Sequence, residues 1–100
     1  MVKHLVFFKL TKFDSPEEKK LQLKRMKDIF SLLGVKFPFI IEYRTGINFN
    51  EASHAWDFVI DSIFRDKKDL QKYQESVEHK EAIRKGSEIE KTKAVIDYEF

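Results

Sequence analysis

The alternation of residues 2–10 constrains the fold more strongly than any other feature of this chain. One set of alternate positions is apolar apart from a single histidine: Val2, His4, Val6 and Phe8. The positions between them carry Lys3, Leu5, Phe7 and Lys9. A period of two is that of a β-strand, in which successive side chains point to opposite faces of a sheet. Because large apolar side chains stand in both sets, we expect both faces of this strand to be covered.

A helix is predicted to follow this strand. Ser15 can accept a hydrogen bond at the N-cap, Pro16 suits the first helical position and Glu18 completes a capping box. The apolar residues that follow form one helical stripe: Leu23, Met26, Phe30 and Leu33. Gly34 marks the expected end of the helix.

The remaining segments complete a βαββαβ order. Strands are expected at residues 39–48, 56–65 and 93–100. A second helix, capped by Asp66 and kinked near Ser76, carries its buried residues on one side: Leu70, Tyr73 and Val77, then His79, Ile83 and Gly86. The order predicts a single α+β domain, residues 1–100, with a ferredoxin-like fold in which a four-stranded antiparallel sheet carries both helices on one face.

The two sheet faces predict a dimer. If the helices cover the face that carries His4 and Phe8, four apolar residues of the first and third strands point outward: Leu5, Phe7, Val59 and Ile63. An exposed apolar patch of this kind is typical of an interface, so we expect a homodimer that presses two sheets into an α/β barrel. The same face is expected to carry charges that pair across the interface: Lys3, Lys9, Asp57 and Asp61. A monomer with a scattered apolar surface is the alternative.

Composition narrows the classes of function. The chain has no cysteine, which excludes disulfides, thiolate metal sites and cysteine nucleophiles and fits a cytoplasmic location. Its net charge of +2 is too small to predict nucleic-acid binding. No segment resembles a signal peptide or a membrane span. The three histidines lack the spacing of metal ligands, so we expect neither metal nor cofactor.

Several stretches together resemble the stress-responsive α/β barrel (Dabb) family. They are residues 2–10 and 95–99 at the two ends of the chain, Phe37-Pro38, Gly46-Ile47-Asn48, Phe64, and Tyr73 with His79 six residues later. The resemblance implies a ferredoxin-like fold and a homodimeric barrel. It covers the whole chain in the same order.

The resemblance also implies candidate site residues. A plant polyketide cyclase of this family uses a Tyr–His pair, without metal or cofactor, and the pair corresponds to Tyr73 and His79; its first-strand histidine corresponds to His4. The family's usual His-Pro-Ala-His is Ser76-Val77-Glu78-His79 here, so only the last histidine is kept. Cavity-lining aromatic residues of the cyclase's first helix are replaced by Gln22, Leu23 and Met26.

Each candidate has a functional and a structural interpretation. His79 can act as a general acid or base, with Tyr73 holding a carbonyl or enolate oxygen and Asp97 orienting the imidazole. Alternatively, His79 is a histidine satisfied by backbone carbonyls near a helix end, and His4 is a core histidine with one hydrogen-bond partner. A ligand pocket between sheet and helices is expected to be lined by His4, Val6, Phe8, Met26, Phe58, Ile60 and Ile83.

Two hypotheses about function therefore stand side by side. In the first hypothesis, the chain is a cofactor-independent enzyme, a cyclase, lyase or monooxygenase-like protein that acts on a small carbonyl compound. Otherwise it is a non-catalytic, stress-associated dimer whose cavity is plugged by its own bulky residues: Phe8, Met26, Phe58 and Ile83.

Overall fold

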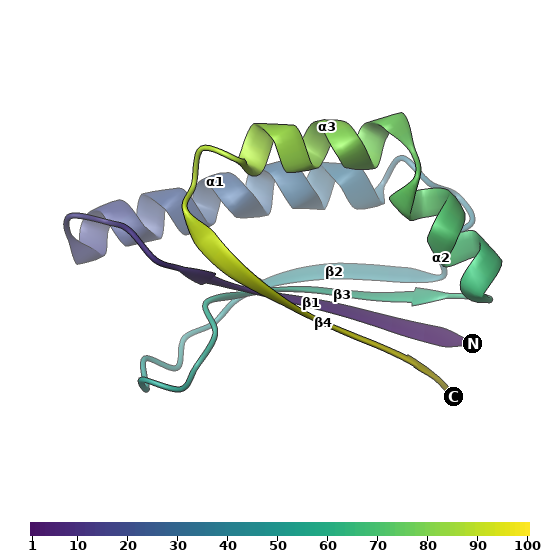
Figure 1. Ribbon diagram of the computed structural model, residues 1–100, viewed down its shortest axis with the longest axis horizontal. Helices are drawn as coiled ribbons and strands as arrows, with labels where there is room; N and C mark the ends of the chain where they lie inside the picture. Colours follow the sequence, from purple (N-terminus) through teal and green to yellow (C-terminus); the bar gives the residue numbers. More distant parts are fainter.

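A computed structural model describes all residues of the chain, 1–100. Its elements are β1 (Val2–Leu10), α1 (Pro16–Gly34), β2 (Glu42–Ile47), β3 (Phe58–Phe64), α2 (Lys67–Gln74), α3 (Val77–Gly86) and β4 (Lys91–Glu99). The strands form one antiparallel sheet in the order β2-β3-β1-β4, and the helices lie on one side of it (Figure 1). The predicted α+β, ferredoxin-like fold is confirmed.

The start of α1 follows the predicted capping pattern. Ser15 Oγ accepts a hydrogen bond from the backbone N–H of Glu18 at 3.1 Å, and Pro16 is the first helical residue. The helix ends at Gly34 as expected. Glycine stands there because of close packing and not because of a left-handed backbone, since no glycine of the chain has a positive φ. A Cβ on Gly34 would lie 2.0 Å from the ring of Tyr43, so this position admits only glycine unless the ring moves.

The second helical segment is divided at Ser76. Ser76 Oγ accepts a hydrogen bond from the backbone N–H of His79 at 3.0 Å and so caps a new helix, α3, after the end of α2. The restart turns the following residues to a new face. Val77, which the sequence analysis placed on the buried side, is 78% exposed, while Ala82 and Gly86 pack inward.

The alternation of β1 is confirmed in the sheet. Its inner residues, from Val2 to Leu10 at every second position, are all buried beneath the helices, while the residues between them are half-buried on the outer face. β3 alternates in the same way and pairs with β1, so Phe8 lies opposite Phe58 and Phe7 opposite Val59. Leu5, Phe7, Val59 and Ile63 thus share the outer face, as predicted.

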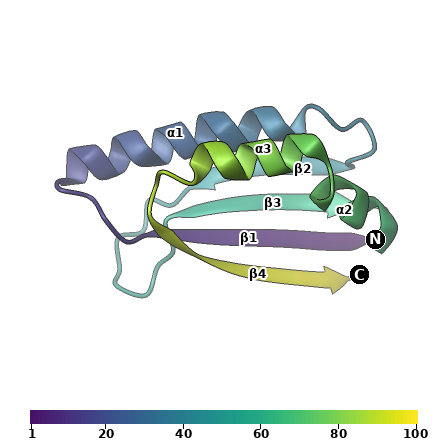
Figure 2. The same ribbon diagram turned by 45° about the horizontal axis from the view of Figure 1, so that its top comes forward.

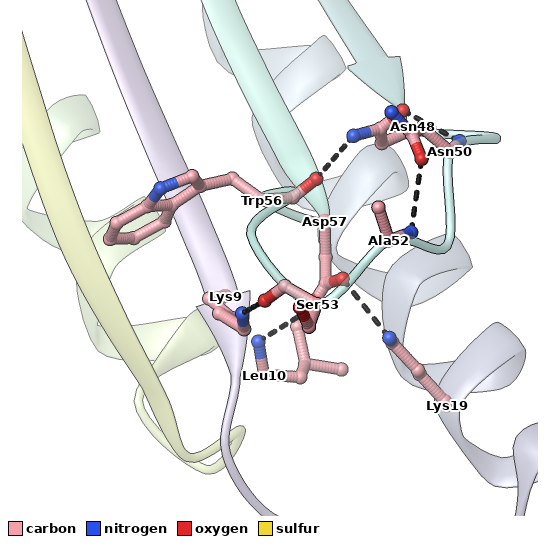
Figure 3. A network of polar contacts seen from close by, with 9 residues as sticks. All are labelled: Lys9, Leu10, Lys19, Asn48, Asn50, Ala52, Ser53, Trp56 and Asp57. Atoms are coloured by element: carbon pink, nitrogen blue, oxygen red, sulfur yellow. Dashed lines mark hydrogen bonds and ion pairs between the residues drawn. The ribbon is translucent and has the colours of Figure 1, made fainter.

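The start of β3 differs from the prediction. The strand begins at Phe58, so the alternation does not extend back to Trp56 and Asp57. Asp57 is buried and points toward α1, where its carboxylate accepts a hydrogen bond from the backbone N–H of Leu10 at 2.8 Å and pairs with Lys19 at 3.0 Å (Figure 3). Trp56 instead lines a shallow hollow on the outer side together with Phe7 and Val59.

The charged residues that do lie on the outer face have polar partners within the chain. Lys3 pairs with Asp61 at 2.6 Å. Figure 3 shows Lys9, which donates to the backbone carbonyl of Ser53 at 2.8 Å. The expectation that charges pair across an interface is wrong for Asp57, which turns toward α1, and for the other three residues pairing across an interface stays a prediction. Since Lys3 and Asp61 neutralise each other within the chain, the outer face offers mainly apolar side chains for contact with another protein.

Asp57 joins β1, β3 and α1, which gives a testable consequence for stability. Asp57→Ala leaves the buried N–H of Leu10 without a partner, so we expect a loss of about 2–3 kcal/mol in the free energy of unfolding, measured by urea denaturation. Lys19→Met removes only a partly exposed ion pair and should cost less than about 1 kcal/mol. Equal losses in the two variants would show that the ion pair, and not the backbone contact, is the important interaction.

Candidate functional site

A cavity of about 330 Å³ lies between the inner face of the sheet and the helices, and it is partly open to solvent. It forms because α3 packs mainly against α1 and leaves the inner face at β4 thinly covered (Figure 2). Thirteen residues line it: His4, Val6, Phe8, Phe30, Ile60, Tyr73, Gln74, His79, Ile83, Ser87, Lys91, Lys93 and Val95. Tyr73, His79 and five of the seven residues predicted to line a pocket are among them.

Met26 and Phe58 do not line the cavity, which corrects the prediction. Their side chains are 0% and 1% exposed and belong to the solid core. Phe30 of α1 lines the cavity instead, with its ring stacked on Phe8 at 5.7 Å between centroids and tilted on Phe58 at 6.3 Å. The core therefore has its own aromatic contacts, and the cavity beside it stays open.

His4 is held by a carboxylate from the neighbouring strand. The register of β1 and β4 places Asp97 opposite His4, and Nδ1 of His4 hydrogen-bonds Oδ1 of Asp97. The direction of Asp97, which the sequence left open, is therefore inward. Its imidazole partner is His4 and not His79, which corrects the predicted pairing.

The ring of His4 is 3% exposed and is fixed on several sides. It makes edge contacts with Phe64 and Tyr73, at 6.2 and 6.4 Å between centroids. With Nδ1 bonded to Asp97, Nε2 is the ring nitrogen left for a ligand, because no group of the protein hydrogen-bonds it. A histidine fixed in this way has a defined tautomer when neutral, with the proton on Nδ1 and a lone pair on Nε2.

His79 comes from the first turn of α3 and is half-buried. Its ring meets the ring of Tyr73 edge-on at 4.8 Å. Burial lowers the pKa of His79 below its ordinary 6.5, and the nearby His4 and Lys93 lower it further. The side chain is therefore neutral near pH 7, with one nitrogen able to donate and the other able to accept a hydrogen bond.

Tyr73 lies at the centre of an aromatic cluster beneath the cavity. It is 2% exposed, with Phe37 and Phe64 each 5.3 Å from its ring. Burial raises its pKa to about 12, although hydrogen bonding with Tyr43 acts in the opposite direction. The hydroxyl of Tyr43 donates in turn to the carbonyl of Phe30 at 2.8 Å. The polar end of Tyr73 is thus turned toward Tyr43, and its ring supports His79.

Six lining residues were not anticipated from the sequence: Phe30, Gln74, Ser87, Lys91, Lys93 and Val95. The signal for three of them was the parity of the last strand. Once Asp97 is placed inward, Val95, Lys93 and Lys91 must follow on the same face. Phe30 stands on the predicted buried stripe of α1, but nothing local shows that it reaches the cavity wall.

The structure has no group of three or more His, Asp or Glu side chains able to hold a metal ion together. None of the helices combines the length and the apolar character needed to cross a membrane. That this protein needs neither a metal nor a cofactor stays a prediction.

Comparisons with known proteins add the following. The family description "Stress responsive A/B Barrel Domain" (Dabb) matches residues 2–100. A dimeric protein of unknown function with a ferredoxin-like fold from Bacteroides fragilis is 31% identical, covering 99% of this chain and 95% of that one, with a TM-score of 0.84. No match was found among curated proteins.

Two more distant solved structures share the fold. A Dabb family protein from Mesorhizobium loti is 20% identical, with coverage of 99% and 95% and a TM-score of 0.69. The hydroxynitrile lyase of Passiflora edulis is 17% identical, with coverage of 97% and 90% and a TM-score of 0.75. The same fold therefore occurs in proteins of unknown function and in an enzyme.

Proposed function

The chain belongs to the stress-responsive A/B barrel (Dabb) family, and we propose that it binds a small, largely apolar carbonyl compound in its cavity and transfers a proton on it without a cofactor. The observation that carries the proposal is the meeting of two histidines, one bonded to a carboxylate and one held neutral, in a cavity that no side chain fills. A non-catalytic dimer with a plugged cavity fits less well, because two of the expected plugs, Met26 and Phe58, lie in the core.

His4 is the better base of the two. Its Nε2 carries the lone pair, and the Asp97 carboxylate on Nδ1 stabilises the imidazolium that forms when Nε2 takes a proton. His79 is less suited to this task because burial, His4 and Lys93 all lower its pKa. Its neutral ring can instead donate a hydrogen bond to the oxygen on which negative charge develops.

Tyr73 is assigned a positioning role. The sequence suggested that its hydroxyl holds the oxyanion, but this side chain is nearly fully buried and its polar end lies beside Tyr43. Its ring edge lies against His79 and also against His4. Tyr73 thus fixes the two imidazoles relative to each other, and the ring is more important than the hydroxyl.

Removal of a proton next to a carbonyl can be measured without knowing the natural substrate. We expect the protein to accelerate exchange of the α-hydrogens of a small aryl ketone, such as phenylacetone, for deuterium in D₂O, as followed by NMR. His4→Gln and His79→Gln should each reduce this acceleration by about 10²-fold or more, since positioned acid–base groups contribute on that scale. Tyr73→Phe should keep most of it.

His54→Gln is the matched control, because His54 lies exposed in the loop between β2 and β3. This variant should accelerate exchange of the α-hydrogens of the ketone as much as the unaltered protein does. Exchange that persists in His4→Gln and His79→Gln, or that the unaltered protein does not accelerate, would contradict acid–base chemistry in the cavity.

We further propose that the working unit is a homodimer closed through the outer sheet face. The related Bacteroides fragilis protein is described as dimeric. In this chain the outer face joins the apolar residues of β1 and β3 to Ile96 and Tyr98 of β4, each about half exposed. Lys3 pairs with Asp61 and Arg44 with Glu42 within the chain, so a second copy would meet few unpaired charges on this face. The lack of cysteine supports a cytoplasmic location for this dimer.

A charge placed on this face should abolish association. Phe7→Glu or Val59→Lys is expected to yield monomer or insoluble protein in size-exclusion chromatography with light scattering, because an unpaired charge in an apolar interface is costly. Leu21→Glu on α1 is the matched control, since Leu21 is an exposed apolar residue on the helical side. Dimers that persist unchanged in both outer-face variants would place the interface elsewhere.

A further inference from the structure

Two lysines on β4 mark the end of the cavity that lies away from the histidine–aspartate pair. The register pairs Lys93 with Phe8 and Asp97 with His4, and the two β4 residues are four positions apart. At about 3.4 Å per residue, their backbones are about 14 Å apart along the strand. Between them, Val95 lies opposite Val6. The floor of the cavity is therefore polar at each end and apolar in the middle.

Both lysines lack an acidic partner. No Asp or Glu is among the residues that line the cavity. The nearby acids Glu88 and Glu90 pair elsewhere, with Arg25 at 2.9 Å and Lys12 at 3.8 Å. The cavity thus carries positive charge from two lysines that no carboxylate of the protein balances.

Lys91 is held in place by the protein itself. Its Nζ donates to the backbone carbonyl of Gly86, the last residue of α3, at 2.7 Å and to that of Ile89 at 3.0 Å. The ammonium group also lies 5.8 Å from the centre of the Phe8 ring. An ammonium has three donors, so one remains free for a ligand. Lys93 makes no hydrogen bond or ion pair and keeps all three.

We propose that the ligand of this cavity carries a carboxylate, which Lys93 and Lys91 bind, while its carbonyl end lies between His4 and His79. This inference rests on the proposed function and specifies the class of its substrate as an amphiphilic oxo acid. The apolar middle of the ligand packs on Val6, Phe8 and Val95. Charge-assisted hydrogen bonds at one end then fix the register of the reacting carbonyl at the other.

The two ends of the cavity are electrostatically connected. Lys93 is one of the groups that lower the pKa of His79, and burial together with Lys93 lowers the pKa of Lys91. A carboxylate bound between the lysines would offset part of this positive charge. Binding of an acidic ligand should therefore raise the pKa of His79, whereas a neutral ligand of the same shape should not.

The test compares 4-benzoylbutyrate, an aryl ketone with a terminal carboxylate, with its neutral primary amide by isothermal titration calorimetry. We expect the acid to bind the unaltered protein at least about tenfold more tightly than the amide, since hydrogen bonds to charged groups contribute on that scale. Lys93→Gln and Lys91→Gln should each reduce this preference to about threefold or less. The preference should also weaken between about 50 mM and 500 mM salt.

Lys24→Gln is the matched control, because it removes one positive charge from an exposed position on α1 and leaves the cavity unchanged. It should keep the full preference. Equal binding of acid and amide would overturn this inference and leave the proposed function standing, as would a preference that persists in both β4 variants. Failure of both compounds to bind would overturn the inference and the proposed function together.

Discussion

The two-residue period of β1 is the constraint on which the rest of the structure depends. This strand lies between β3 and β4 and pairs with both along nearly its whole length. Its parity sends His4 and Phe8 toward the helices and Leu5 and Phe7 toward the outer face. A slip of one residue would exchange the two sets, placing the histidine outside and the phenylalanine of the outer face in the core. Core, cavity and proposed interface therefore share one cause.

The cavity follows from how the helices are distributed over the sheet. α1 and α3 pack against each other, and the aromatic core of Phe8, Phe30 and Phe58 fills the space beneath α1. Because α2 ends at Gln74 and α3 restarts at Ser76, His79 is turned toward the sheet near the inner face of β4. The site thus joins a histidine from a helix start to a histidine from the central strand.

The features that could be predicted from the sequence are those that neighbouring residues determine. The cap of α1 and the faces of β1 could be predicted from a few adjacent residues, and the structure has them as expected. The kink predicted near Ser76 is a full break between two helices. Features set by distant contacts could not be predicted. Asp57 turns inward because α1 and the end of β1 supply its partners. Asp97 meets His4 because of a register between strands 93 residues apart, which no local pattern encodes. That Phe30 and not Phe58 lines the cavity likewise depends on how α1 packs on the sheet, which no local pattern encodes.

The central claim is that His4, oriented by Asp97, and His79 share one ligand cavity. Long-range ¹H–¹⁵N correlation spectra of the histidine rings test it most directly, in the free protein and with 4-benzoylbutyrate added. The account predicts that neutral His4 carries its proton on Nδ1, that His79 titrates below its ordinary 6.5, and that the ligand shifts the signals of both rings. A proton on Nε2 of His4, a normal titration of His79, or ligand-induced shifts confined to His54 would contradict it.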